Sequence, residues 1–191
     1  MGAVQQQPPP AAGAAAPWRM TIRVTVNGRR HELAVEPRET LLEVIRERLG
    51  LTGAKRSCDM QVCGACTVLL DGRPVSACTL LAVEARDREV LTIEGLERDG
   101  RLHPLQEAFI EHGGFQCGFC TPGMILTAKA LLDENPRPTV EEVKHFMRGN
   151  ICRCTGYKKI LESILAAAER LAAERTVGGA AAAGGPGSGR S

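Results

Sequence analysis

The chain has 191 residues, and its 24 lysines and arginines nearly balance its 22 aspartates and glutamates, for a formal net charge of +2. This length allows one large domain or two small ones, and the interleaved charges give no electrostatic footprint for nucleic acid. No stretch approaches the roughly 18 consecutive apolar residues of a membrane span.

The two ends of the chain predict disordered tails. Residues 1–19 are mostly Gln, Pro, Ala and Gly, and residues 176–191 are mostly Gly, Ala and Ser, so neither end can bury enough apolar surface to offset the entropy of ordering. The front tail has no basic start and its alanines are interrupted by proline, unlike a signal peptide. We therefore expect a cytoplasmic protein, in which eight cysteines indicate metal binding or redox chemistry rather than disulfides.

Residues 20–96 show mostly the alternating pattern of strands. Residues 21–26 and 31–35 alternate on either side of Asn27-Gly28, the favoured pair for a type I′ hairpin turn. The pair Arg29-Arg30 could suggest a twin-arginine export signal, but the apolar stretch that such a signal needs does not follow it. A place in the hairpin is the better explanation of this pair. Further strands are predicted at 67–70 and 90–93, with a turn at Asp71-Gly72.

A helix is predicted after the first hairpin. Thr40 and Glu43 form a capping box at its start, and Gly50 is placed to end it. Its apolar face consists of Leu41, Leu42, Val44, Ile45 and Leu49. Strands with one helix make residues 20–96 a small α+β domain.

Residues 97–175 change to a helical period and predict a second domain. Pro104 begins one helix and Thr121-Pro122 begins another, while Thr139 and Glu142 form a capping box for a third. A fourth helix is predicted from about Tyr157. Histidines are scattered along the chain and are expected to be surface or capping residues rather than ligands; they are His31, His103, His112 and His145.

The first set of cysteines has the spacing of plant-type ferredoxins, with four intervening residues, then two, then a longer gap. Its members are Cys58, Cys63, Cys66 and Cys78. A tight loop with small residues can supply three thiolates, and the fourth lies beyond the Asp71-Gly72 turn. A zinc site or buried free cysteines are the alternatives, but zinc sites more often use two separated pairs. The spacing favours a 2Fe–2S cluster.

The second set consists of Cys117, Cys120, Cys152 and Cys154. The first pair lies just before the helix that begins at Thr121-Pro122, where the helix dipole favours thiolates. Taken alone, this pair fits a thioredoxin-like redox site or half of a zinc site as well. The pair separated by one residue is unusual for zinc and fits a small iron–sulfur cluster.

Three stretches resemble the iron–sulfur subunit of the molybdenum hydroxylases, the family of xanthine dehydrogenase, aldehyde oxidase and aerobic carbon monoxide dehydrogenase. They are Cys63-Gly64-Ala65-Cys66-Thr67-Val68, Gln116-Cys117-Gly118-Phe119-Cys120-Thr121-Pro122-Gly123 and Gly149-Asn150-Ile151-Cys152-Arg153-Cys154-Thr155-Gly156-Tyr157. The resemblance runs from about residue 20 to 174.

The resemblance implies an α+β protein with an N-terminal β-grasp, plant-type ferredoxin domain and a C-terminal four-helix bundle, each binding a 2Fe–2S cluster. It also implies a molybdopterin-binding large subunit and an FAD-binding subunit as partners. The chain would be the non-catalytic electron-transfer subunit of an oxidoreductase complex, and Gln116 would contact the pterin. The length predicts a separate small subunit rather than the front of a fused polypeptide.

The sequence departs from the family pattern at Ser57 and Gln61, where glycine is usual. If the backbone at Gln61 needs a positive φ, this residue costs about 1 kcal/mol more than glycine. Two other functions compete with the family reading: a free-standing two-cluster ferredoxin that shuttles between enzymes, and a structural zinc module with eight thiolates. The substrate, the direction of electron flow and the terminal acceptor are not encoded in this chain.

Overall fold

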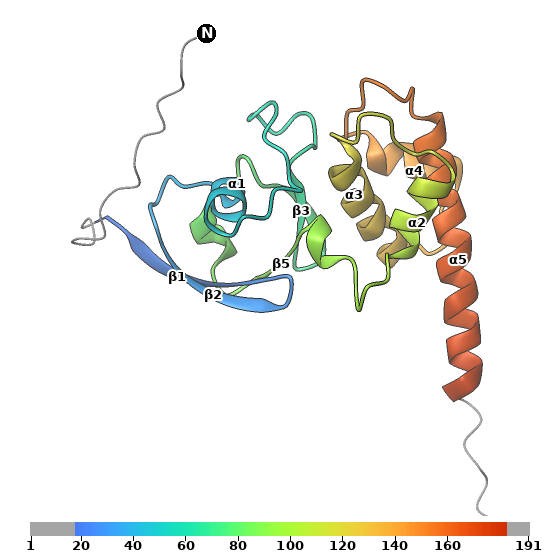
Figure 1. Cartoon of the computed structure of the whole chain (residues 1–191), viewed down its shortest axis with the longest axis horizontal. Helices are drawn as coiled ribbons and strands as arrows, with labels where there is room; N and C mark the ends of the chain where they lie inside the picture. Colours follow the sequence, from blue (N-terminus) through green and yellow to red (C-terminus); the bar gives the residue numbers. More distant parts are fainter. Residues whose placement is uncertain (1–17, 183–191) are drawn as a thin grey trace, which may run out of the picture.

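The computed structural model describes residues 18–182. It consists of a five-stranded sheet with one helical segment packed on it, followed by a group of longer helices (Figure 1). Of the front tail predicted at 1–19, only Trp18 and Arg19 are among the described residues. Of the tail predicted at 176–191, residues 183–191 lie outside them.

The sheet has the strand order β2-β1-β5-β3-β4, with β1 and β5 parallel and the other neighbours antiparallel. The predicted hairpin at Asn27-Gly28 is confirmed, because both residues have the positive φ of a type I′ turn, 51° and 76°. The Asn27 side chain also accepts a hydrogen bond from the Thr92 amide at 2.8 Å, which fastens this turn to the end of β5. The strands are β1 (Met20–Val26), β2 (Arg29–Val35), β3 (Thr67–Leu70), β4 (Arg73–Ser76) and β5 (Glu89–Leu91).

The predicted helix over 41–49 is present but is wound in two ways. Its first turn is α1 (Leu41–Glu43), and it continues as a π-helical turn, Val44–Arg48. The predicted capping box is confirmed, since the Thr40 hydroxyl accepts from the Glu43 amide at 3.2 Å and the Glu43 carboxylate accepts from the Thr40 amide at 2.8 Å. The buried face of this segment packs into the core under the sheet.

Two short 3-10 turns were not predicted. They are Ala82–Ala85 and Ile93–Gly95, and the second shortens the strand predicted at 90–93. Both lie where the chain leaves the sheet, and a few residues give too short a pattern to separate a 3-10 turn from a strand end.

Four helices follow the sheet and share a second hydrophobic core around Phe109, Met124, Ile160 and Ile164. None of the helices in residues 18–182 combines the length and apolarity that a bilayer crossing requires. The helices are α2 (Pro104–Glu111), α3 (Thr121–Glu134), α4 (Val140–Met147) and α5 (Lys158–Ala182).

The last helix is longer than predicted. It continues to Ala182, so the assignment of residues 176–182 to a disordered tail is wrong. This end of the chain is rich in alanine, which has the best intrinsic helix propensity, and the helix can therefore propagate from the packed turns before it.

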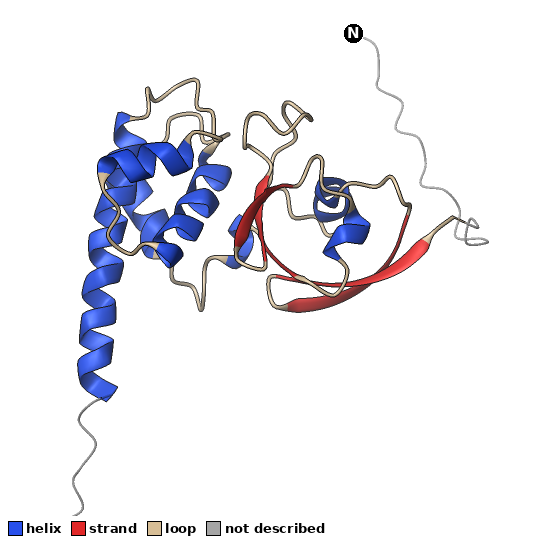
Figure 2. Ribbon diagram, turned by 180° about the vertical axis from the view of Figure 1, so that it is seen from behind, coloured by secondary structure: helices blue, strands red, loops and turns tan. Residues whose placement is uncertain are grey.

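The two parts of the molecule meet where β3 lies beside α3 (Figures 1 and 2). Val68 and Leu70 of β3 face the core under the sheet, whereas Leu69 points the other way and packs against Leu126 and Ala130 of α3. The whole strand is therefore buried, on both faces.

His103 is a capping residue, as predicted, and it makes the start of α2 sensitive to pH. Its Nδ1 accepts from the Leu105 amide at 3.2 Å, which requires the neutral ring. Burial, with a smaller effect from Lys129, lowers the pKa of His103 from 6.5 to about 4. Because the folded-state pKa is lowered, the contribution to stability is present above pH 6.5 and is lost as the pH falls from 6.5 towards 4.

We expect His103→Asn to keep the cap and remove this pH dependence. Asparagine supplies a cap acceptor that does not titrate, so the variant should gain about 2 kcal/mol relative to the wild type between pH 7 and pH 5. Urea unfolding of both proteins at the two pH values measures the difference. Parallel loss of stability in both proteins would show that His103 is not the group responsible.

Candidate iron–sulfur sites

All eight cysteines are free thiols, and they gather into the two predicted sets. The loop before β3 carries Cys58, Cys63 and Cys66, while Cys78 follows β4 and is brought alongside Cys66 by the β3–β4 hairpin. In the second set, Cys120 precedes α3, and the segment between α4 and α5 carries Cys152 and Cys154.

Within each set the thiols are paired. Cys58 interacts with Cys63, and Cys66 with Cys78. In the second set the Sγ atoms of Cys117 and Cys154 are 3.5 Å apart, and Cys120 interacts with Cys152. Among residues 18–182 no three cysteine, histidine or carboxylate side chains gather around a point that could hold a single metal ion. Two pairs per set match a 2Fe–2S cluster, in which each iron takes two protein thiolates.

Backbone amides surround the first thiol of the first set. Hydrogen bonds from the amides of Met60, Val62 and Cys63 lower the pKa of Cys58 to about 6. The sulfur is therefore largely a thiolate at neutral pH, which is the form that binds metal. Burial has the opposite effect on Cys66, where it raises the pKa of the thiol to about 12.

The second set has the same contrast between a buried thiol and one that is stabilised as thiolate. Burial and the neighbouring Cys152 raise the pKa of Cys120 to about 12. Burial alone would raise the pKa of Cys152, but hydrogen bonds from Thr155, the Cys154 amide and Cys120 together outweigh it and lower the pKa. The Thr155 hydroxyl donates to the Cys152 Sγ at 3.1 Å, and the Cys152 amide donates to the Tyr157 hydroxyl at 2.9 Å.

A buried hydroxyl beside the second set lacks a hydrogen-bond partner. Only two buried side-chain oxygen or nitrogen atoms in the described part of the chain are without one, and one of them is the Thr121 Oγ1, next to Cys120. A buried polar group without a partner is costly, so this hydroxyl fits a site whose occupant accepts its hydrogen bond. Cluster sulfur is such an acceptor.

The loop of the first set contains the strained residue that the sequence suggested. Gln61 has a φ of +60°, and Asp59 one of +52°, whereas Ser57 is not in the left-handed region. A residue other than glycine therefore causes backbone strain at position 61, whereas Ser57 is free of this strain. The Gln61 Oε1 recovers part of the cost by accepting from the Thr79 hydroxyl at 3.2 Å.

We expect Gln61→Gly to raise the free energy of unfolding by up to about 1 kcal/mol, because glycine adopts a positive φ without strain. Ser57→Gly is the matched control. It should not raise the free energy of unfolding, because its main effect is to increase the entropy of the unfolded chain. Thermal unfolding of the two variants tests this. Equal stability changes in both would contradict the assignment of strain to Gln61.

Gln116 is exposed beside Cys117, as a side chain that reaches another molecule would be. Arg153 is also exposed. The residues that sequence reasoning missed are Thr121, Thr155 and Tyr157, which contact or adjoin the second set, and Asn150, which is 6% exposed. Thr155 and Tyr157 stand in the quoted family stretch, but only the folded segment shows which atom each one contacts.

Two family models match the chain in sequence order. A 2Fe-2S iron-sulfur cluster binding domain matches residues 24–92, and a 2Fe-2S binding domain matches residues 92–165. The chain is 49% identical over 154 residues to the nicotinate dehydrogenase small FeS subunit of Eubacterium barkeri, which covers 81% of this chain and 98% of that protein.

Two further relatives agree. The nicotine 6-hydroxylase small subunit of Paenarthrobacter nicotinovorans is 51% identical over 147 residues, 77% of this chain and 88% of that protein. Among solved structures, that of quinoline 2-oxidoreductase from Pseudomonas putida 86 superposes with a TM-score of 0.78 at 47% identity, covering 83% of this chain and 98% of that one.

Proposed function

The chain belongs to the family of small iron–sulfur subunits of molybdenum hydroxylases, and we propose that each of its two cysteine sets holds one 2Fe–2S cluster. The pairing of the thiols carries this proposal, since one pair serves each of two irons. A 2Fe–2S cluster takes up and releases one electron at a time. The function of the chain is electron transfer within an oxidoreductase complex.

The ligand assignment follows the pairs. Cys58 and Cys63 would hold one iron of the first cluster, and Cys66 and Cys78 the other. For the second cluster, Cys117 pairs with Cys154, and Cys120 with Cys152. The amides around Cys58 and the hydroxyl of Thr155 donate hydrogen bonds to cysteine sulfur, and the unpartnered Thr121 hydroxyl would donate to a bound cluster; such bonds raise the reduction potential of these centres.

We propose two units, residues 20–96 with the β-grasp ferredoxin fold and residues 97–175 as a four-helix bundle. Each has its own hydrophobic core, which supports the division. All eight cysteines are free thiols, and this supports a place in the reducing cytoplasm.

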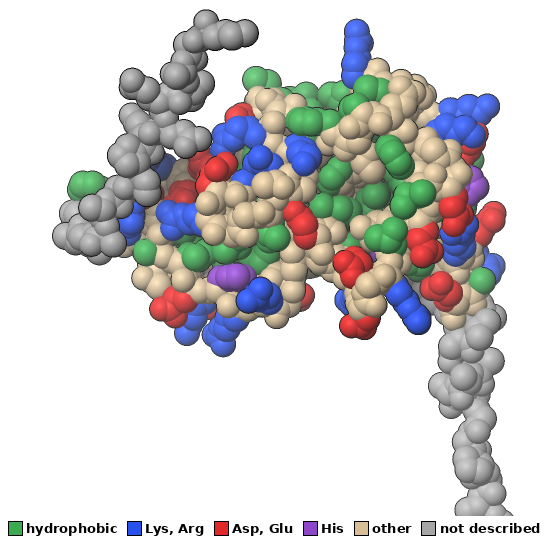
Figure 3. All heavy atoms as spheres, in the orientation of Figure 1, with side chains coloured by type: hydrophobic (Ala, Val, Ile, Leu, Met, Phe, Trp, Pro, Cys, Tyr) green, Lys and Arg blue, Asp and Glu red, His purple; other side chains and the backbone are tan. Residues whose placement is uncertain are grey.

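The proposed partners are a molybdopterin-binding large subunit and an FAD-binding subunit. Apolar side chains near the cysteines are exposed, and they support burial of this surface in a complex: Met60, Val62, Phe115, Phe119, Ile151 and Tyr157 are all 39% exposed or more. Figure 3 shows hydrophobic side chains along the upper part of the face and across its middle. Gln116 would reach the pterin from the second set, so the chain would receive electrons there and deliver them from the first set.

The test is the iron, zinc and acid-labile sulfide content of anaerobically purified protein, with electron paramagnetic resonance (EPR) after dithionite reduction. About four irons and two distinguishable signals are expected, one for each set of four thiolates. Zinc in place of iron, or half the iron with one signal, would refute the two-cluster assignment. Co-expression with its proposed partners should give a stable complex, whereas a chain that remains alone would be a free-standing ferredoxin.

A further inference from the structure

Two residues in the loop of the first set, Asp59 and Gln61, have a left-handed backbone, whereas Met60 between them does not. Backbone that alternates in this way turns successive N–H groups to one side and forms a concavity that holds an anion. The amides that follow the two left-handed residues are those of Met60 and Val62, and both donate to the Cys58 sulfur. The strained backbone is therefore what aims these amides at the sulfur.

Arg56 holds the first of these residues. Its Nη1 donates to the Asp59 Oδ2 at 3.1 Å, and its Nη2 lies 3.5 Å from the Glu43 Oε1. Glu43 is itself fixed, because its other oxygen accepts from the Thr40 amide in the capping box at the start of α1. A guanidinium can hold two carboxylates at once because its donors are spread over a rigid plane. Asp59 is therefore anchored to an element outside its own loop.

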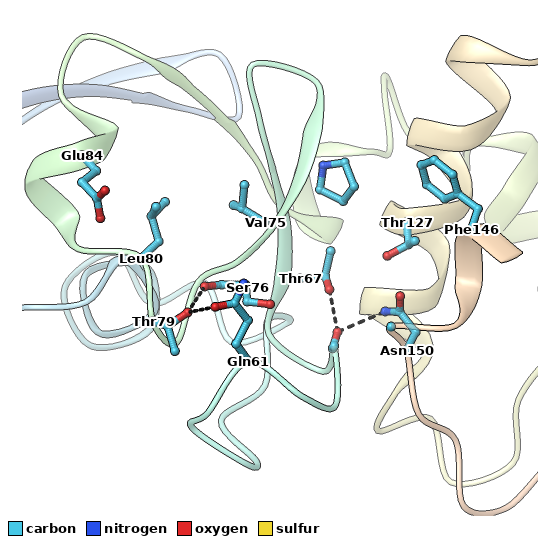
Figure 4. A pocket seen from close by; sticks show the side chains of 13 residues that line it. Gln61, Thr67, Val75, Ser76, Thr79, Leu80, Glu84, Thr127, Phe146 and Asn150 are labelled. Carbon is cyan, nitrogen blue, oxygen red and sulfur yellow. Dashed lines mark hydrogen bonds between the residues drawn. The ribbon is translucent and has the colours of Figure 1, made fainter.

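Thr79, which directly follows Cys78, holds the second. Its hydroxyl lies 3.2 Å from the Gln61 Oε1 and 3.3 Å from the Ser76 carbonyl, and it shares its proton between these two acceptors. Figure 4 shows both bonds converging on the Thr79 hydroxyl. The bond to Ser76 ties Thr79 to the end of β4. Each of the two left-handed residues therefore has a side-chain partner that lies outside the segment between Cys58 and Cys63.

We propose that Arg56 and Thr79 are positioning residues, which hold the left-handed backbone at Asp59 and Gln61 and thereby raise the reduction potential of the first cluster. This inference rests on the proposed function. Reduction adds one electron to the cluster and breaks no bond, and amides aimed at sulfur stabilise the added negative charge. Glycine, which is usual at position 61 in the family, reaches this conformation without support. This chain supports it with side chains instead.

The test uses five variants of the full chain. Arg56→Lys keeps the charge but loses the planar fork that reaches two carboxylates, and Arg56→Gln loses both. Thr79→Val removes the hydroxyl at a similar shape, whereas Thr79→Ser keeps the hydroxyl. Lys55→Gln is the matched control for charge, because Lys55 adjoins Arg56 in sequence but donates to the Thr52 carbonyl, at 2.8 Å. Iron content is measured in each variant first.

Two readouts follow. A redox titration monitored by EPR gives the midpoint potential of each cluster, and the signal of the first is the one that Cys66→Ala removes. This potential should fall in both Arg56 variants and in Thr79→Val, while that of the second cluster stays unchanged. Hydrogen exchange of peptides covering residues 59–63 should be about two- to fivefold faster in the same variants, the factor that one exposed ion pair is worth. Thr79→Ser and Lys55→Gln should match the wild type in both readouts.

Wild-type potential and exchange in Arg56→Lys and Thr79→Val would overturn the proposal alone. So would a potential that follows charge only, falling equally in Arg56→Gln and Lys55→Gln and unchanged in Arg56→Lys. A wild-type chain without iron would refute the proposed function, and the effect on the potential with it. The exchange rates need no iron, so they would still show whether Arg56 and Thr79 hold the loop.

Discussion

Replacing Cys66 with alanine should remove half of the iron and one of the two EPR signals, and replacing Cys120 should remove the other half. Cys66 is buried and Cys120 is half-buried, each beside a second thiol of its set, and burial raises the pKa of each to about 12. Once either thiol is lost, its iron has a single protein ligand, and the cluster of that set cannot be completed. The two sets lie on different elements, so each variant should keep the opposite cluster.

Iron and sulfide analysis, with EPR of the dithionite-reduced variants, provides the measurement. The two variants control for each other, since they should lose different signals. If either variant lost all its iron, the clusters would depend on each other for assembly. If both lost the same signal, the assignment of the cysteines to two separate sets would be wrong.

Gly64→Ala should destabilise the chain by about 2–4 kcal/mol. The glycine has a φ of +69°, which alone costs alanine about 1 kcal/mol. The added methyl would also meet the Asn150 side chain and the Gly149 carbonyl at 2.6 Å, and such overpacking typically costs a further 1–3 kcal/mol.

Gly72→Ala separates these two contributions. Gly72 has a φ of +79°, in the β3–β4 turn, but no atom lies within 4 Å of a Cβ built there, so it should lose only the backbone term of about 1 kcal/mol. Urea unfolding of both variants measures the difference. If both variants lost the same free energy of unfolding, the contact between Gly64 and the Gly149-Asn150 segment would be able to open and accommodate the methyl group at little cost.

Much of the fold was predictable, because its signals are local. The Asn27-Gly28 turn, the Thr40–Glu43 and Thr139–Glu142 capping boxes and the helix starts at Pro104 and Thr121 are all present as expected. Each depends on residues within one turn of each other. The π-helical turn at Val44–Arg48 and the extension of α5 were not predicted, since apolar spacing does not separate these windings or fix a helix end.

The candidate site divides in the same way. Spacing nominated the first four cysteines, because one tight loop supplies three of them, whereas the assignment of the second four also needed the family resemblance, since they lie in two separate segments. The sequence could not predict which cysteines lie in pairs. Nor could it predict that the Asn150 side chain donates to the Gly64 carbonyl, or that Gly123 lies close to this carbonyl. Asn150 and Gly64 are 86 positions apart, and their roles arise only when two separately folded loops meet.

The junction at β3 also bears on what happens when the chain is cut. Residues 97–102, which connect the sheet to the helices, are all exposed and include Arg98 and Arg101, so trypsin has access to the connection. A nick there would break the backbone but not the packing of Leu69 against α3. The two fragments would separate on a denaturing gel and still travel as one particle in gel filtration, so susceptibility to proteolysis at this connection would be no sign of independent halves.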